Sequence, residues 1–269
     1  MKKTLLASAL ASVLFAVSLP ASAAAIGHLN SGSQNMAGSN LSYIVSNGLI
    51  TPSEADSYAT LTNAAFNAMT PGALATAYDI LVMPWYVNTD ANFDWNTRLL
   101  PYLNAGGSIL WENPEDLGEI QGAANSGVSM TASNLYGPGV GPSGTIALAA
   151  PFGDLGAEGF YHIHFSITAH DASWNCWSVD INGGCHGVNK EFAGGGRMVI
   201  GVSDNLYHPN FALAGDSDHR QLTINELNWL ATGSITGEPP SPVPEPASLA
   251  LLGIGLAGLA AIRRRKTTV

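Results

Sequence analysis

The 269-residue sequence predicts an α/β protein that has a mainly parallel sheet and a β-rich insertion. Two short apolar runs, residues 78–83 and 108–111, flank a segment with helical periodicity, which is the pattern of a βαβ unit. A third apolar run at residues 197–201 is followed by an amphipathic segment and repeats the pattern. Residues 118–195 are rich in Gly, Ser and Pro and include strand-like alternation, so we expect the insertion there.

The first part of the body is predicted to hold two helices. Leu41, Ile44 and Val45 recur with helical spacing, and Asn47-Gly48 is the expected end of the first helix. Thr51 to Glu54 has the arrangement of a capping box that starts a second helix. The side chains that this second helix would carry are Tyr58, Leu61, Ala65 and Phe66.

The βαβ unit and the last pair of elements follow. Residues 78–83 form a continuous apolar run before Pro84, as in a strand buried on both faces. Asp94 is the expected N-cap of the crossover helix, and the glycines within residues 104–107 end it. Residues 108–111 should pair in parallel with the first strand, because a helix connects the two. Residues 221–231 form the predicted last helix.

Residues 1–23 have the layout of a secretory signal peptide. Lys2 and Lys3 precede an apolar run at residues 5–19, and Ala21-Ser22-Ala23 offers a cleavage site of the A-x-A type. An uncleaved membrane anchor is the alternative, although the apolar run is short for a membrane span. We therefore expect export and a mature body over residues 24–236.

The C-terminal segment has the features of a second targeting signal. Residues 237–246 are rich in proline and predict a stiff linker that ends in Pro244, Glu245 and Pro246. An apolar stretch follows within residues 247–269, a predicted transmembrane helix with a basic tail. The basic residues place the tail end in the cytoplasm by the positive-inside rule. These residues are Arg263, Arg264, Arg265 and Lys266.

This order of motif, apolar span and basic cluster resembles the PEP-CTERM sorting signal. The resemblance covers about Val243 to Lys266. It implies recognition by an exosortase, transient anchoring in the inner membrane, cleavage near the Pro-Glu-Pro and release to the cell surface or outside the cell. It also implies an association with exopolysaccharide and biofilm formation. A permanent C-terminal anchor that is never cut is the alternative.

The charge of the body bears on its partners. The two terminal signals contain six of the ten basic residues and one acidic residue, Glu245. The rest of the chain therefore has four basic and nineteen acidic residues, a net charge of about −15. Such a surface repels nucleic acid and anionic polysaccharide, and it could attract divalent cations. A solvated acidic surface of an exported protein explains the same composition.

Cys176 and Cys185 are the two cysteines of the chain. In an oxidising compartment an even number of cysteines predicts a disulfide, here across a turn at Asn182-Gly183-Gly184. A pair of zinc thiolates is the alternative, but the spacing is longer than that of a usual zinc motif.

Three pieces of the body together resemble the class I glutamine amidotransferase-like fold. They lie at residues 78–84, 99–110 and 196–230. The resemblance implies a flavodoxin-like three-layer sandwich. It also implies a nucleophilic Cys just after the strand at residues 108–111, where this sequence has Asn113 followed by Pro114. Asn cannot act as that nucleophile, and Pro114 lacks an N–H that could hold an oxyanion, so we expect no amidotransferase activity.

Two further groups of residues could form sites. His162 and His164 share a face of a predicted strand, and with His170 they could bind Zn; a solvent-facing polar row is the alternative. Glu112, Asn113 and Asp204 follow predicted strands, so they could line a ligand edge, as open parallel sheets often do. Oxygen-rich loops near Asp204 could hold Ca²⁺, but the sequence has no EF-hand pattern.

The sequence therefore supports two hypotheses on function. The first is an exported surface or matrix protein without catalytic activity, which could bind extracellular polysaccharide. The second is an extracellular, carbohydrate-active hydrolase that depends on a metal or on carboxylates. The resemblance to the sorting signal and the missing nucleophile favour the first.

Overall fold

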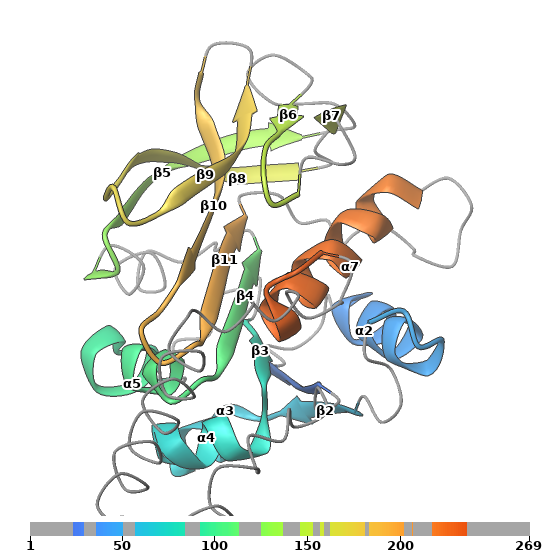
Figure 1. Ribbon diagram of the computed structural model, residues 1–269, viewed down its shortest axis with the longest axis vertical. Coiled ribbons are helices and arrows are strands. Elements are labelled where there is room, and N and C mark those ends of the chain that lie inside the picture. Colours follow the sequence, from blue (N-terminus) through green and yellow to red (C-terminus); the bar gives the residue numbers. More distant parts are fainter. Residues whose placement is uncertain are drawn as a thin grey trace, which may run out of the picture.

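The computed structural model describes residues 24–29, 36–50, 57–83, 92–112, 125–136, 146–152, 157–158, 162–180, 183–201, 206 and 217–235. One sheet runs through these residues, and its strands follow the order β2-β1-β3-β4-β11-β10-β9-β6-β7 (Figure 1). Strands β5 and β8 pair with each other, and β8 also pairs with β10. The sheet has a parallel part and an antiparallel part that meet between β11 and β10.

The parallel part contains β1 (Ala25–Leu29), β2 (Ser57–Leu61), β3 (Ile80–Val82), β4 (Ser108–Glu112) and β11 (Arg197–Gly201). Every neighbouring pair in the order β2-β1-β3-β4-β11 is parallel. This is the order of doubly wound, flavodoxin-like sheets, in which the chain reverses its direction of winding between β1 and β3. The βαβ unit predicted from residues 78–111 is confirmed.

Helices cover both faces of the parallel part, which makes the predicted three-layer sandwich. Helices α2 (Met36–Ser46) and α7 (Ser217–Thr232) lie on one face (Figure 1). The other face carries α3 (Asn63–Ala68), α4 (Pro71–Ala77), the π-helical turn η1 (Trp95–Leu99) and α5 (Leu100–Asn104). Each face has its own core, one containing Leu41, Leu110 and Leu227 and the other containing Phe66, Leu103 and Trp111.

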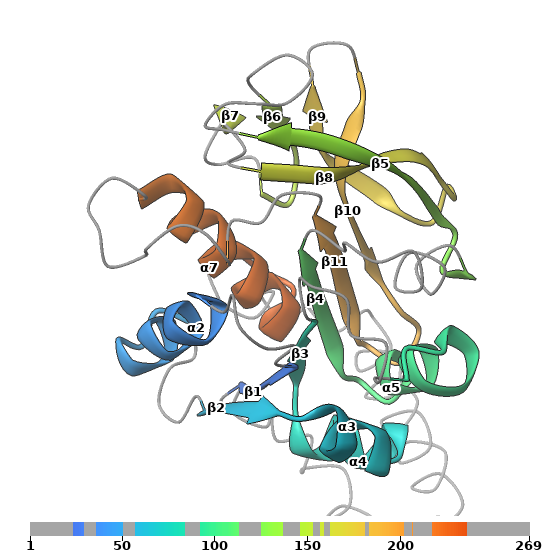
Figure 2. The same ribbon diagram turned by 180° about the vertical axis from the view of Figure 1, so that it is seen from behind.

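The insertion extends the sheet instead of forming a separate lobe. It contains β5 (Val128–Tyr136), β6 (Ile146–Leu148), β7 (Ala157–Glu158), β8 (His162–His170), β9 (Asn175–Asp180) and β10 (Cys185–Glu191). All the pairings that these strands make are antiparallel. Strands β5 and β8 lie side by side at the end of the sheet that is far from α3 and α4 (Figure 2). The prediction of a β-rich segment is confirmed.

The crossover helix begins and ends where the sequence predicts. Asp94 caps it, because the Asp94 carboxylate accepts a hydrogen bond from the Thr97 N–H at 2.7 Å. Gly106, with φ of 96°, follows the last turn in the left-handed conformation that glycine adopts without strain.

The helix predicted from Thr51 to Phe66 is wrong in its first part. Tyr58 and Leu61 belong to strand β2, which pairs with β1 along its whole length. The helices start later, with Thr62 as the N-cap of α3 and Thr70 as the N-cap of α4. Pairing with β1 overrides the helical spacing of Tyr58, Leu61 and Ala65, because the partner strand supplies hydrogen bonds that local sequence does not reveal. Residues 51–56 lie outside the described residues.

Cys176 and Cys185 form the predicted disulfide, with a Cα–Cα distance of 6.0 Å. The bond joins β9 to β10 within the antiparallel part. Its sulfur atoms are therefore not available as zinc thiolates in this oxidised state.

The hairpin between β10 and β11 packs tightly on the end of α5. A Cβ atom at Gly196 would come within 2.2 Å of the carbonyl oxygens of Leu103 and Gly107. A Cβ atom at Gly194 would come within 1.9 Å of the Asn104 carbonyl oxygen. Since these neighbours are backbone atoms, only glycine fits at the point where the two parts of the sheet meet.

Among the helices that the structure describes, none combines the length and apolar character needed to cross a bilayer. The predicted signal peptide, the linker and the C-terminal span at residues 247–269 lie outside the described residues.

Candidate functional site

The carboxyl ends of the parallel strands form the edge at which open α/β sheets usually bind ligands. Strand β4 ends at Glu112 and β11 ends at Gly201. Asn113 and Asp204 follow these strands but lie outside the described residues. Of the predicted ligand edge, the structure therefore places Glu112 alone, and the edge itself stays a prediction.

Glu112 is buried, with 3% of its surface exposed, and it points toward the face that carries α2 and α7. Its Oε2 atom accepts a hydrogen bond from the Leu206 N–H at 2.7 Å. Asn40 of α2 donates to the Leu206 carbonyl oxygen, also at 2.7 Å. Two side chains thus satisfy both backbone groups of Leu206, a buried residue outside the helices and strands.

Glu226 of α7 is the partner of Glu112. It is 2% exposed, and burial, then the charge of Glu112, then a hydrogen bond with Glu112 raise its pKa well above the usual range. Two close carboxyl groups cannot both ionise in such an environment, so the pair retains a proton. Glu226 was not among the residues predicted from the sequence. Its position could have been inferred, since Leu222, Glu226 and Leu230 recur every four residues on one helical face.

Aromatic side chains fill the space beside this carboxyl pair. Trp177 packs edge-on against Phe152 with ring centroids 4.9 Å apart, and Phe152 packs against Trp229 at 6.0 Å. A Cβ atom at Gly201 would lie 3.9 Å from Glu112 and 4.0 Å from Trp177, so the two side chains flank the end of β11. Glu112 is therefore enclosed in a packed interior and engaged in structural hydrogen bonds.

His28 of β1 is a further buried titratable group, and it was not among the residues predicted from the sequence. Burial lowers its pKa to about 4, so the imidazole is neutral at physiological pH. Its Nδ1 atom lies 3.2 Å from the hydroxyl oxygen of Tyr58 on the neighbouring strand, within hydrogen-bonding distance. This contact ties β1 to β2 at the edge of the sheet.

The predicted histidine site is only partly described. His162 and His164 lie on β8, but their side chains lie outside the described residues. His170 is exposed and hydrogen-bonded to the Asp171 carbonyl oxygen at 3.1 Å. A register shift between Ser129 and Met130 of β5 interrupts regular pairing between His164 and His170, so spacing alone does not put all three on one face. The metal site stays a prediction.

Among the described residues, His170, Cys176 and Cys185 bring three potential ligand atoms within 4.8 Å of one another. The two sulfur atoms are bonded to each other, so this group offers a single ordinary ligand, the His170 imidazole.

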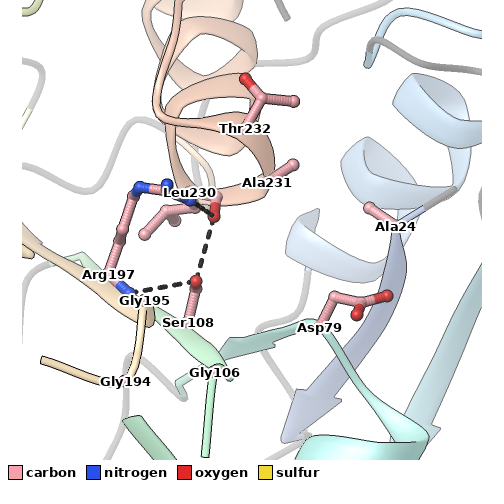
Figure 3. A pocket seen from close by; sticks show the side chains of 10 residues that line it. All are labelled: Ala24, Asp79, Gly106, Ser108, Gly194, Gly195, Arg197, Leu230, Ala231 and Thr232. Carbon is pink, nitrogen blue, oxygen red and sulfur yellow. Dashed lines mark hydrogen bonds between the residues drawn. The ribbon is translucent and has the colours of Figure 1, made fainter. Parts of the chain in front are cut away.

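A pocket of about 360 Å³ opens at the opposite edge, where the parallel strands begin (Figure 3). Ala24 and Asp79 form one wall, Ser108 and Arg197 face them, and the end of α7 lies above. The Ser108 hydroxyl donates to the Leu230 carbonyl oxygen at 3.0 Å, and the Arg197 guanidinium donates to the same oxygen at 3.3 Å. The Asp79 carboxylate accepts a hydrogen bond from the Ala25 N–H at 2.8 Å. Sequence reasoning did not point to this pocket.

Several solved structures are similar to the body of the chain. ThuA-like proteins from Parabacteroides merdae and Bacteroides uniformis have TM-scores of 0.47, are 10% and 12% identical, and cover 82% and 79% of this chain. The alignments cover 94% and 95% of those two proteins. An exo-β-1,4-mannosidase from an Opitutaceae bacterium has a TM-score of 0.44 and 13% identity; it covers 78% of this chain, which spans 35% of that enzyme. At these values the similarity carries no inference about activity.

No curated protein matches the sequence. A family model, the PEP-CTERM protein-sorting motif, matches residues 242–266. The match includes Pro244, Glu245, Pro246 and the basic cluster, so the prediction made from these residues is confirmed. The chain therefore carries the PEP-CTERM motif of an exported protein that an exosortase sorts.

Proposed function

We propose that the mature protein is a non-catalytic component of the cell surface or the extracellular matrix, released after exosortase cleavage near Pro244–Pro246. The sorting motif at residues 242–266 is the observation that carries this proposal. The Cys176–Cys185 disulfide and the acidic composition of the body suit an exported protein.

Two observations support the absence of catalysis. The position of the amidotransferase nucleophile is occupied by Asn113, which cannot attack an amide carbonyl. Glu112, the carboxylate next to it, is buried, accepts the Leu206 N–H and shares a hydrogen bond with Glu226. A general acid or base must reach its substrate, and this side chain is enclosed.

Mass spectrometry of the C-terminus tests the sorting part. We expect protein from the surface or medium of the native host to lack Arg263 to Lys266. A Glu245→Ala variant should stay in the inner membrane with its basic tail intact. A Glu238→Ala variant, changed in the same linker but outside the matched residues, is the control and should behave as the wild type. Surface protein that retains the tail would contradict the proposal.

A link to exopolysaccharide is the finer part of the proposal. We expect the purified mature protein to be retained by exopolysaccharide from its own host. Because the body is acidic, we expect retention on neutral polymers or through divalent cations, and less retention on anionic polymers after chelation. Equal mobility with and without polysaccharide in gel electrophoresis would contradict this part.

The extracellular hydrolase remains the alternative proposal, resting on His162, His164, His170 and the acidic loops. Metal analysis of the purified mature protein separates the two. Stoichiometric zinc that is lost in a His164→Ala variant, together with hydrolysis of a glycan, would favour the hydrolase. A folded, metal-free protein without hydrolytic activity would favour the surface component.

A further inference from the structure

We propose that the pocket at the beginning of the parallel strands binds the mature amino terminus of the chain, which signal-peptide cleavage after Ala23 would create at Ala24. The proposal rests on the export route of the proposed function. It adds that the site of signal-peptide cleavage decides whether the new amino group lies in this pocket. The α-ammonium group of Ala24 would lie in the same pocket as the Asp79 carboxylate and the carboxyl end of α7.

The folded body begins almost at the predicted cleavage site. Strand β1 starts at Ala25, and Ala24 is already buried, with 2% of its surface exposed, in the core beneath α2 and α7. The Ala24 carbonyl oxygen accepts a hydrogen bond from the Ser57 N–H at 3.1 Å, so the sheet holds this residue in place. A mature chain that starts at Ala24 would have its amino group held at the end of the sheet where the parallel strands begin.

Asp79 provides the negative charge for this amino group. Its carboxylate accepts the Ala25 N–H at 2.8 Å, and its own N–H donates to the Ala25 carbonyl oxygen at 2.8 Å. Three covalent bonds separate the nitrogen atoms of Ala24 and Ala25, so the two atoms are at most about 4 Å apart. The α-ammonium would therefore lie within about 7 Å of the Asp79 carboxylate, at the wall of the pocket where Figure 3 shows both residues.

Helix α7 contributes a second attraction. Its last residues, Leu230, Ala231 and Thr232, line the same pocket, and its last turn contains no basic residue. The carboxyl end of a helix carries partial negative charge, so it favours nearby cations. Arg197 already donates to the Leu230 carbonyl oxygen, and the amino terminus would add a second cation at this end. In the precursor the nitrogen of Ala24 is a neutral amide, and cleavage would convert it into that cation.

Arg197, the other charged residue in the pocket wall, lies across from Ala24. Among the ten described residues of the lining, Asp79 and Arg197 carry charge. Arg197 donates to Leu230 and to Glu191, the latter at 3.3 Å, so its guanidinium is engaged at the far wall. Tyr102, which interacts with Asp79, has its pKa raised well above the usual range, mainly by burial, and it stays neutral. Asp79 is therefore the charged group that the amino terminus meets.

A thermodynamic cycle tests the inference. The chain from Ala24 to Val269, released from a fusion by cleavage just before Ala24 and kept in detergent, is compared with a form that has Gly-Ser ahead of Ala24. Each is made with Asp79 and with the Asp79→Asn substitution. We expect the extension to lower Tm by about 2–4 °C with Asp79 and by less than about 1 °C with Asp79→Asn. Equal losses in both backgrounds, or no loss, would overturn the inference.

A pH comparison does not depend on the folding of the Asp79→Asn variant. An α-amino group ordinarily titrates at about 7.7–8.0, and it is attracted to a carboxylate only while protonated. The Tm difference between the two N-terminal forms should therefore be full near pH 6 and absent near pH 10. A difference that is the same at both values would overturn the inference.

The N-terminal sequence of the exported protein completes the test. Protein from the native host should begin at Ala24, and any other first residue would overturn the inference. The sorting proposal is measured separately at the C-terminus, so either one can fail while the other stands.

Discussion

The parallel and antiparallel parts of the sheet are stabilised in different ways. Helices contact β2, β3, β4 and β11, and the inner strands β3 and β4 are buried along their whole length. The antiparallel strands have register shifts in two pairings, β5 with β8 and β9 with β10, and a disulfide joins β9 to β10. Burial between two helical layers organises the first part, while cross-strand pairing and a covalent link organise the second.

An aromatic cluster connects the two parts on the face that carries α5. Phe192 follows β10, and its ring lies 6.0 Å from Trp95 of η1 and 6.1 Å from Trp174 before β9. Lys190 lies over the rings of Trp174 and Phe192, at 5.5 and 5.1 Å. The junction is therefore packed through side chains as well as paired through β10 and β11.

The largest effect is expected from a Gly196→Ala substitution at this junction. The new Cβ atom would meet two backbone carbonyl oxygens at 2.2 Å, and backbone cannot move aside as a side chain can. We expect the free energy of unfolding to fall by about 3 kcal/mol or more. Urea unfolding measures it.

Gly195→Ala is the matched control for that substitution. A Cβ atom at Gly195 meets nothing within 4 Å, but the residue has φ of 86°. Its cost should stay near the strain of a left-handed residue, about 1–2 kcal/mol. Equal losses in the two variants would show that the close approach at Gly196 does not matter.

Removal of the disulfide should weaken the antiparallel part more than the parallel part. A Cys176→Ser, Cys185→Ser double variant loses a link across a short loop, which we expect to cost about 2–3 kcal/mol. Hydrogen exchange should rise in β9 and β10 and change little in β3 and β4. A uniform rise across the sheet would mean that the two parts form one cooperative unit.

The Glu112–Glu226 pair predicts how the parallel part responds to pH. The folded state raises the pKa of Glu226 above that of an exposed glutamate, so folding retains a proton that the unfolded chain releases. The proton on Glu226 contributes fully to the stability of the fold below the ordinary glutamate pKa. This contribution is lost as the pH rises toward the raised pKa of Glu226, by at most about 1.4 kcal/mol per pH unit.

A Glu226→Gln variant tests that response. Gln keeps a hydrogen-bond donor for Glu112 but does not titrate, so the stability of the variant should fall less steeply with pH. Glu191→Gln is the control for a general loss of acidic charge. An unchanged pH dependence in Glu226→Gln would contradict the retained proton.

The smallest effect is expected for Glu191→Gln itself. Glu191 ends β10 and pairs with Arg197 of β11 at 3.3 Å, but its side chain is 59% exposed. Exposed ion pairs contribute little, so we expect a change below about 0.5 kcal/mol in thermal unfolding. A larger loss would show that charge, in addition to packing, holds the two parts together.

The difference between the two parts also explains which predictions from sequence succeeded. Residues 78–83, 108–111 and 197–201 are short apolar runs, and all three are strands because a strand buried on both faces needs such a composition. Asp94 marks a helix start through a local hydrogen bond. Strand β1 was missed, although it pairs with both β2 and β3, and β2 was predicted as helix because its only described strand partner is β1.

The sequence by itself determined the sorting motif, the disulfide, the three core strands, the crossover and last helices, and the presence of a β-rich insertion. Each depends on residues that are near one another in the chain or on a pattern that burial imposes. Only the tertiary structure decided that the insertion extends the main sheet, that Glu112 meets Glu226, and that Ala24 lies beside Asp79. These contacts join segments that are far apart in the sequence. A local pattern of residues does not indicate which distant segment folding will bring into contact.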